Sequence, residues 1–215
     1  MLSARDTFDG LLCPGSALPR ILVPVEAKDQ RGALEFWRAV ATVPSERSEA
    51  LERLEACFAA GSTPKDPDGP HAGTLVATTL DIGLNLLMEL LARVWMPWKG
   101  KTFEASRGEG WNLFTPGFRR MARVLWPSYD RFERQGARRL TAFRFVTDVG
   151  SSVGDPDREV LRIVYDLPEN PSLIRPIVDE LVLVYDGLYL GQALRPWRGR
   201  IRRAAWFALE AELDP

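Results

Sequence analysis

A series of short β-type segments that follows Trp98 constrains the fold of this chain more than any other feature. Each segment is rich in β-branched and aromatic residues and is bounded by Gly, Pro, Asp or Asn, which is the pattern of strands separated by turns. The predicted strands are residues 101–105, 111–114, 140–148, 160–166, 181–186, 189–194 and 204–211, preceded by a β-type segment at 74–80. Most of the connections are too short for the crossovers that parallel strands need. We therefore predict an antiparallel sheet that closes or curves strongly into a small barrel, which leaves few strand edges exposed.

Helical patterns precede and interrupt this series. Residues 45–60 carry apolar side chains at helical spacing, with Ser45 placed to cap the first turn and Gly61 placed to end the last one. Residues 82–95 are apolar on nearly all sides and predict a central helix, and residues 118–125 predict a short one. The expected fold class is therefore α+β and mainly antiparallel β, with N-terminal and central helices.

The length of 215 residues fits a single domain over 1–215. Its first part, residues 1–70, is predicted to be helical or irregular, and its second part, residues 71–215, holds the predicted barrel. Residues 61–73 form a polar stretch rich in Pro and Gly, which predicts a loop. His71 lies in this stretch, so we expect its side chain to be exposed to solvent.

Charge and hydropathy favour a soluble, cytoplasmic protein. The formal net charge of −1 provides no overall field for nucleic acid or for an acidic membrane surface. No signal peptide is expected at the N-terminus, and the longest apolar run, residues 82–95, is too short and too polar for the roughly 20 residues of a membrane span. Two cysteines make no disulfide framework, so a reducing compartment is expected. The excess of Arg over Lys is typical of a GC-rich bacterial genome.

One short motif occurs twice in the chain. Residues 97–101 read Pro-Trp-Lys-Gly-Lys, and residues 196–200 read Pro-Trp-Arg-Gly-Arg. In one interpretation each copy is a turn whose tryptophan covers the end of the core while its cations stay in water. In the other, the cations and indoles of both copies converge at one mouth of the barrel and receive an anionic or aromatic group.

Several kinds of chemistry lack the residues that they need. His71 is the single histidine, and Cys13 and Cys57 have no ligand spacing, so no metal site is predicted. Ser151 and Ser152 lack the surroundings of a nucleophile elbow, and the glycines around them lack the Lys of a phosphate loop. No cofactor is expected from this sequence.

Acid–base catalysis and ligand binding remain. Tyr165, Asp179 and Glu180 lie at predicted strand ends, and a carboxylate that faces an apolar barrel interior is able to transfer protons. The aromatic residues of the predicted barrel are candidates to line a ligand cavity, with Lys101 or Arg144 for a polar head group. These aromatic candidates are Trp98, Trp111, Phe143, Phe145, Tyr165, Trp197 and Trp206. The alternative is that the rings fill a solid core.

The segment Trp98-Lys99-Gly100-Lys101-Thr102-Phe103 resembles the start of a strand in uncharacterised bacterial proteins of the GxWxG type, which are thought of as lipocalin-like. Residues 164–168 and 177–181 are similar to the C-terminal part of those proteins. Of the Gly-x-Trp-x-Gly motif itself, this chain keeps Trp98-Lys99-Gly100 and has Met96 where the first glycine stands. The resemblance implies a lipocalin-like barrel and carries no catalytic residues.

Three functions follow as hypotheses. The first is a carrier that binds a small hydrophobic, amphipathic or anionic molecule in an aromatic-lined cavity. The second is a cofactor-independent, isomerase-like or cyclase-like enzyme that acts on an apolar substrate through Tyr165, Asp179 or Glu180. The third is an interaction protein without a pocket. An aromatic-lined cavity of several hundred Å³ separates the first two from the third, and a buried carboxylate inside that cavity favours the enzyme.

Overall fold

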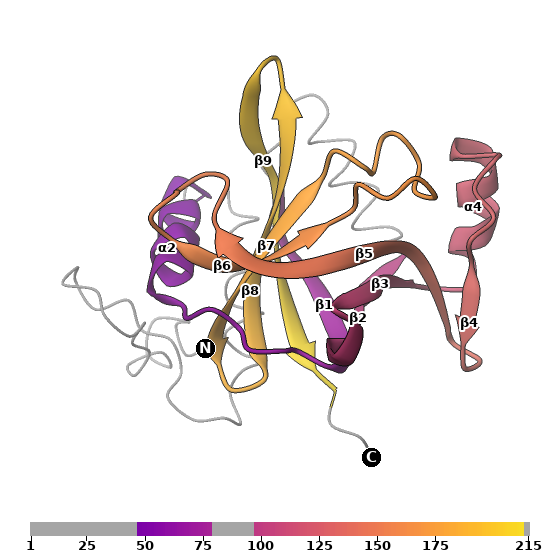
Figure 1. Ribbon diagram of the computed structural model, residues 1–215, viewed down its shortest axis with the longest axis horizontal. Helices are drawn as coiled ribbons and strands as arrows, with labels where there is room; N and C mark the ends of the chain where they lie inside the picture. Colours follow the sequence, from indigo (N-terminus) through magenta and orange to yellow (C-terminus); the bar gives the residue numbers. More distant parts are fainter. Residues whose placement is uncertain (1–46, 79–96, 213–215) are drawn as a thin grey trace, which may run out of the picture.

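The computed structural model describes residues 47–78 and 97–212 of the chain (Figure 1). The elements in chain order are α2 (Arg47–Ala60), β1 (Gly69–Thr78), β2 (Trp98–Glu104), the 3₁₀ turn η2 (Ala105–Arg107), β3 (Glu109–Phe114), α4 (Phe118–Leu125), β4 (Glu133–Gln135), β5 (Arg139–Ser151), β6 (Glu159–Val164), β7 (Val178–Tyr185), β8 (Leu188–Trp197) and β9 (Arg200–Ala211). The predicted central helix at 82–95 lies outside the described residues. None of the helices in the described part of the chain has the length and apolarity that a membrane crossing needs.

The strands form one closed antiparallel barrel. Nine strands lie in the order β3-β2-β1-β9-β8-β7-β6-β5-β4, and a further pairing between β3 and β5 closes all of them except β4 into a ring. Strands that are neighbours in the ring are also consecutive in the chain, with two exceptions. Between β3 and β5 the chain passes through α4 and β4, and the first strand, β1, pairs with the last, β9. This is up-and-down connectivity. The prediction of an α+β, mainly antiparallel and barrel-like fold is confirmed.

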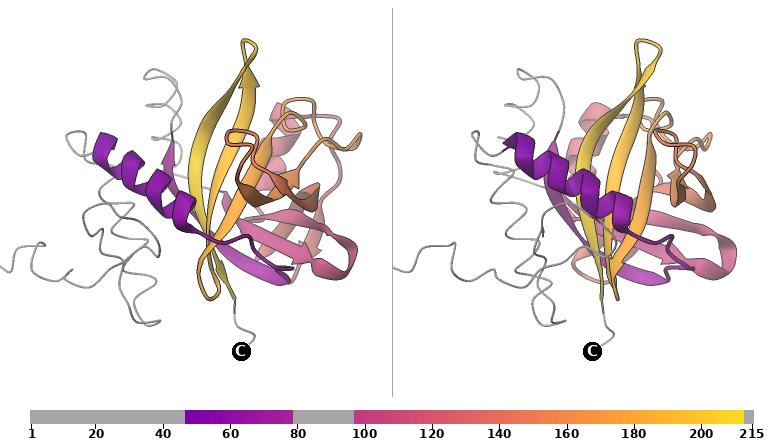
Figure 2. Two further views of the ribbon diagram at one scale, coloured as in Figure 1. Left: turned by 60° about the vertical axis from the view of Figure 1, so that its left-hand side comes forward. Right: turned by 90° about the vertical axis from the view of Figure 1, so that its left-hand side faces the viewer.

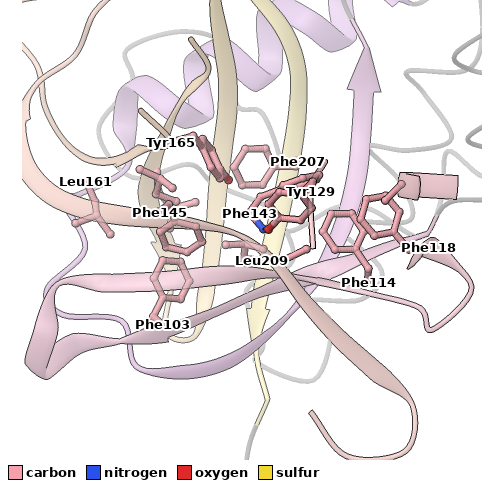
Figure 3. Close-up of a cluster of buried hydrophobic side chains, with 14 residues drawn as sticks. Phe103, Phe114, Phe118, Tyr129, Phe143, Phe145, Leu161, Tyr165, Phe207 and Leu209 are labelled. Carbon is pink, nitrogen blue, oxygen red and sulfur yellow. The ribbon is translucent and has the colours of Figure 1, made fainter. Parts of the chain in front are cut away.

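Alternation along each strand divides the side chains between the inside and the outside of the barrel. Leu161 and Ile163 of β6 face the interior, while Arg162 between them faces outward and donates a hydrogen bond to Asp148 Oδ2 at 3.1 Å. The interior is filled mostly by aromatic and aliphatic side chains, many of which appear in Figure 3. They include Phe103, Phe114, Phe118, Phe143, Phe145, Phe207 and Leu209.

A second apolar cluster lies outside the barrel, beneath α2. This helix crosses the outer face of the sheet, where it contacts β7 and β8 (Figure 2). Leu54, Cys57 and Phe58 form the apolar stripe that the sequence predicted, and they pack with Val182 and Trp206 of the sheet. The rings of Phe58 and Trp206 meet edge to face with their centroids 5.6 Å apart. The prediction of a helix near residues 45–60 is therefore confirmed, and its apolar stripe covers the barrel wall.

The prediction for His71 is wrong. Its side chain is 1% exposed and lies within β1, which begins at Gly69 and so includes part of the predicted loop. The imidazole packs edge to face against Phe103 and Tyr189, and burial lowers its pKa below the ordinary value. β1 pairs with β2 on one side and β9 on the other, and these two ladders outweigh the turn preference of the Pro and Gly residues.

Gly73, one of the glycines that suggested a loop, serves close packing instead. A Cβ atom on Gly73 would lie 2.5 Å from Cα of Gly100 and 2.5 Å from the ring of Trp98. Gly100 itself has φ of +132°, which side-chain-bearing residues rarely adopt. Strands β1 and β2 therefore approach each other closely beside the Trp98 ring.

Candidate functional site

A cavity of about 510 Å³ opens inside the barrel, between the end of β1, the start of β2 and helix α4. Its wall is apolar, with contributions from Trp98, Phe114, Phe143, Ile177 and Phe207. Thr78 at the end of β1 also lines the cavity, and four further polar side chains form a connected group that comes from four different strands or strand ends. They are Lys101 of β2, Asn112 of β3, Tyr165 just after β6 and Asp179 of β7.

Lys101 is the centre of this polar group. Its side chain is 2% exposed, and its Nζ donates to Asp179 Oδ2 at 2.8 Å, to Asn112 Oδ1 at 2.9 Å and to the hydroxyl oxygen of Tyr165. An ammonium group has three hydrogens. All three are therefore used, and the cation is fully satisfied by the protein.

Asn112 and Tyr165 extend the network. The Asn112 amide donates to the Tyr165 hydroxyl oxygen at 3.1 Å and to the Phe143 carbonyl at 3.2 Å, and its own oxygen accepts from Trp98 Nε1 at 3.1 Å. The Tyr165 hydroxyl donates to Asp179 Oδ2 at 2.9 Å. The phenol oxygen thus accepts two hydrogen bonds and donates one, which holds it in a defined position.

Asp179 is held through only one of its two oxygens. Both Lys101 and Tyr165 donate to Oδ2, and within the described residues no hydrogen bond reaches Oδ1. Among the described residues, the buried side-chain atoms that lack a hydrogen-bond partner belong to Thr115, Trp126, Asn170 and Trp206, so Asp179 Oδ1 is not one of these buried atoms. Asp179 therefore has a positioned carboxylate with one uncommitted oxygen in a residue that lines the cavity.

The surroundings of the network are aromatic and poorly hydrated. Lys101 Nζ lies 5.1 to 5.9 Å from the ring centroids of Trp98, Phe145, Tyr165 and Phe207. Burial lowers the pKa of the Lys101 ammonium, and the charge of Asp179 opposes that shift. Burial, followed by the charge of Asp179, raises the pKa of the Tyr165 phenol well above its ordinary value, so the phenol stays protonated at neutral pH.

A strained backbone segment supports one side of the site. Phe143 has φ of +52°, and the ladder between β3 and β5 is irregular here, because Trp111 lies opposite Arg144 while the next residue, Asn112, lies opposite Ala142. A left-handed conformation costs a non-glycine residue roughly 1–3 kcal/mol and is common beside functional sites. The bulge aims the Phe143 ring at the cavity and its carbonyl at the Asn112 amide.

The structure brings five of the candidate residues from the sequence to one place. Trp98, Lys101, Phe143, Tyr165 and Asp179 all line the cavity. Phe145 is fully buried in the interior cluster and lies behind Lys101, with its ring centroid 5.3 Å from Nζ.

Other candidates lie away from the cavity. Trp206 is completely buried in the cluster under α2, on the outer face of the sheet. Glu180 follows Asp179 on β7 and therefore faces outward, where Ser152 Oγ at 2.7 Å and Gln192 Nε2 at 2.8 Å donate to its carboxylate. Trp197 is 41% exposed and lies opposite Arg200 at the end of the β8–β9 hairpin.

Trp111 and Arg144 line a different, polar cleft. The Arg144 guanidinium donates to Glu109 Oε2 at 2.9 Å and to Glu169 Oε1 at 3.0 Å, so its charge is matched by two carboxylates. Neither residue is in a position to hold the polar head of a molecule in the barrel cavity.

The two Pro-Trp-basic-Gly-basic segments do not converge. Lys101 lies opposite His71, which in turn lies opposite Ala211 at the end of β9, whereas Arg200 begins β9. Arg200 and Ala211 are eleven residues apart along β9, which corresponds to about 36 Å at roughly 3.3 Å per residue. Lys101 also points inward, so no collar of cations forms from the two copies.

Asn112 is the member of the network that the sequence did not indicate. Asn112 lies between Trp111 and Leu113 in the predicted strand 111–114. An amide in a short apolar strand was the available signal, since a buried amide needs hydrogen-bond partners. The partners themselves lie 11 to 53 residues away in the sequence.

The fold is an eight-stranded, up-and-down antiparallel β-barrel, and the candidate site is an inner cavity with a polar group on its wall. No family model and no curated protein matches the chain. Among solved structures the chain is similar to a crystal structure of a protein from Thermomonospora curvata, with a TM-score of 0.45 and 16% identity over 75% of this chain and 87% of that one. A likeness this distant carries no functional argument, and the resemblance of residues 98–103 to GxWxG-type proteins stays a prediction.

All four tyrosines of the chain have raised pKa values, which predicts a specific alkaline behaviour. Burial is the main cause at each of Tyr129, Tyr165, Tyr185 and Tyr189, and it raises the pKa of Tyr129 to about 12. Above the ordinary tyrosine pKa of about 10 the unfolded chain releases phenol protons that the folded chain keeps, so stability falls as the pH rises from about 10 toward 12.

We therefore expect the tyrosinate absorbance of Tyr129 and Tyr165 to rise together with the loss of near-ultraviolet circular dichroism, in one cooperative alkaline transition, because these two phenols are buried whereas Tyr185 and Tyr189 are partly exposed. The control is the same titration in concentrated guanidinium chloride, where the phenols should titrate near pH 10. Titration of all four phenols near pH 10 in protein that keeps its folded spectrum would contradict the burial of Tyr129 and Tyr165.

Proposed function

We propose that this protein binds a small, mainly apolar and electrically neutral molecule in the barrel cavity, with one oxygen function of the ligand directed at Lys101, Tyr165 and Asp179. The observation that carries the proposal is the combination of a largely apolar wall with a single polar group. A volume of about 510 Å³ lies within the range of small-molecule sites, roughly 300–1,000 Å³, which are mostly apolar with a few placed polar groups. The cavity favours this function over that of an interaction protein without a pocket.

The charge balance of the site favours a neutral ligand over an anionic one. The Lys101 ammonium is already paired with the Asp179 carboxylate at 2.8 Å, so the cavity offers no net positive charge. A carboxylate ligand would place an additional, unpaired charge in an apolar enclosure, and such burial is costly. A hydroxyl or carbonyl group adds no charge and is able to join the existing hydrogen bonds.

Fluorescence of N-phenyl-1-naphthylamine, a neutral apolar dye, tests this proposal. We expect the dye to brighten on binding and to be displaced by decanol at concentrations at least tenfold lower than those needed for decanoate, a chain of equal length with a charged head. Equal displacement, or preference for decanoate, would contradict the charge argument. Absence of dye binding and of any ligand retained in native mass spectrometry would contradict the binding proposal as a whole.

A cavity-filling substitution should separate the barrel interior from its outer wall. Ala205 lines the cavity, and its neighbour Ala204 is similarly half-buried but does not line it. We expect Ala205→Phe to weaken dye binding at least tenfold because the added ring occupies ligand space, while Ala204→Phe leaves the dissociation constant within about twofold. Titration of each variant with the dye checks this. Similar losses in both variants would mean that the dye does not report on the cavity.

A further inference from the structure

We propose that the cavity is also an active site, in which Asp179 moves a proton between carbon atoms of a neutral, enolisable ketone. This inference rests on the proposed binding of a neutral ligand in the same cavity and adds a reaction to it. The class of reaction is a ketone isomerisation that needs no cofactor. The roles of three residues, Asp179, Tyr165 and Lys101, follow from their geometry.

Asp179 is the base. Its Oδ2 is occupied by Lys101 and Tyr165, which orient the carboxylate, and its Oδ1 receives no hydrogen bond within the described residues. A residue that served structure alone would be expected to have both oxygens satisfied, as Glu180 does on the outer face, where Val153 N–H donates to Oε1 at 2.5 Å and Ser152 Oγ to Oε2 at 2.7 Å. The uncommitted oxygen is therefore free to accept a proton from a bound molecule.

Tyr165 is the electrophile that stabilises the carbonyl oxygen. Its hydroxyl hydrogen rotates about the C–O bond, so it is able to turn from Asp179 Oδ2 toward a ligand oxygen. Lys101 Nζ and Asn112 Nδ2 donate to the phenol oxygen at the same time. These two donors polarise the O–H bond and strengthen it as a donor. Lys101 thus acts through Tyr165 and Asp179 as a positioning residue.

The reaction balances without any further reactant. Asp179 Oδ1 takes the proton from the carbon beside the ketone, the C–H pair forms a carbon–carbon double bond, and the carbonyl π pair moves to the oxygen that Tyr165 hydrogen-bonds. The carboxylic acid so formed then returns the proton, either to the same carbon or to the γ carbon of an unsaturated ketone, and the carbonyl re-forms. Isomerisation therefore shifts a double bond and leaves Asp179 ionised again. The apolar wall excludes water, which favours charge stabilisation by fixed dipoles.

Exchange of carbon-bound hydrogen provides the test, with 2-tetralone as the probe, because it is a neutral, apolar ketone with acidic hydrogens beside the carbonyl. The rate of deuterium incorporation in heavy water with phosphate buffer is followed by proton NMR. We expect the native protein to accelerate exchange, and Asp179→Asn to lose at least 10²-fold of that acceleration, since general acid–base groups typically contribute 10²–10⁴-fold. Tyr165→Phe should lose at least tenfold while still binding the dye.

Glu180→Gln is the matched control. It removes a buried carboxylate next to Asp179 on the same strand, but on the outer face, so exchange should stay within about twofold of the native rate. Surface lysines are the same in all of these proteins and contribute equally to the background. Circular dichroism and dye binding show whether each variant folds, and if Asp179→Asn does not, the Tyr165→Phe result decides.

The possible failures are distinguishable. If 2-tetralone displaces the dye but the native protein does not accelerate exchange, or if Asp179→Asn exchanges as fast as the native protein, the catalytic inference is overturned and ligand binding stands. If 2-tetralone displaces no dye from a protein that binds decanol, the ketone is not the substrate class. If no neutral molecule binds at all, the proposed function fails together with this inference.

Discussion

Replacing Lys101 by methionine is expected to lower the free energy of unfolding by about 3–5 kcal/mol, because the change leaves the carboxylate of Asp179 buried without its cation. Lys101 is 2% exposed and Asp179 is 4% exposed, so water cannot substitute for the lost ammonium group. Methionine keeps an unbranched chain of similar length, which limits the cavity that the substitution creates. Urea-induced unfolding of both proteins, followed by circular dichroism, measures the difference.

The double variant Lys101→Met/Asp179→Leu separates the loss of a charge partner from the loss of packing. Removing both charges leaves no unpaired ion, and apolar replacements of buried ion pairs are often neutral or stabilising. We therefore expect the double variant to be more stable than Lys101→Met alone. Two results would mean that the pair is not coupled as its 2.8 Å contact implies. One is a loss below about 1 kcal/mol in Lys101→Met, and the other is a loss in the double variant that equals the sum of the losses in Lys101→Met and in Asp179→Leu.

Trp206→Ala is expected to cost a similar amount, about 3–5 kcal/mol, for a different reason. The indole is completely buried between the sheet and α2, where it contacts Phe58 edge to face. Its ring centroid lies 4.2 Å from Cζ of the Arg203 guanidinium. Truncation leaves a void on the outer face of the barrel. Dye binding in the folded fraction should not change, because this cluster does not line the cavity.

Two matched variants sharpen this prediction. Trp197→Ala removes the same side chain from the exposed end of the β8–β9 hairpin, so its effect should stay within about 0.5 kcal/mol. Trp206→Phe should cost clearly less than Trp206→Ala, because it refills most of the void and because the indole N–H has no hydrogen-bond partner among the described residues. Equal losses for the Trp206→Ala and Trp197→Ala variants would contradict the burial that distinguishes these positions.

The secondary structure could be predicted from the sequence wherever the local pattern was strong. The helix expected at 118–125 has the bounds of α4, and the strand expected at 160–166 corresponds to β6 (Glu159–Val164). Apolar and polar residues that alternate with a period of two, or recur every three to four, are properties of neighbouring residues. The first strand was placed too late because the Pro and Gly residues of β1 indicate a turn until their pairing partners are known.

The candidate site could be predicted only in part. The sequence singled out both Asp179 and Glu180, and strand alternation requires that adjacent residues face opposite ways. Which of the two faces inward depends on the register with β6 and β8, and these ladders turn Asp179 toward Lys101 and Glu180 toward Ser152. Trp206 and Trp197 were likewise equal candidates, and packing under α2 and exposure at a hairpin end separate them.

The sequence by itself determined that this chain forms short antiparallel strands, with helices that precede and interrupt the series, and that about half of its aromatic residues lie in those strands. Barrel closure decided the rest. Lys101 meets Tyr165 across 64 residues of sequence and Asp179 across 78, and both contacts exist because pairing of β3 with β5 completes the ring. Local preferences act over a few residues, whereas the partners of a buried charge are set by which strands become neighbours, and the sequence pattern of one strand carries no record of that choice.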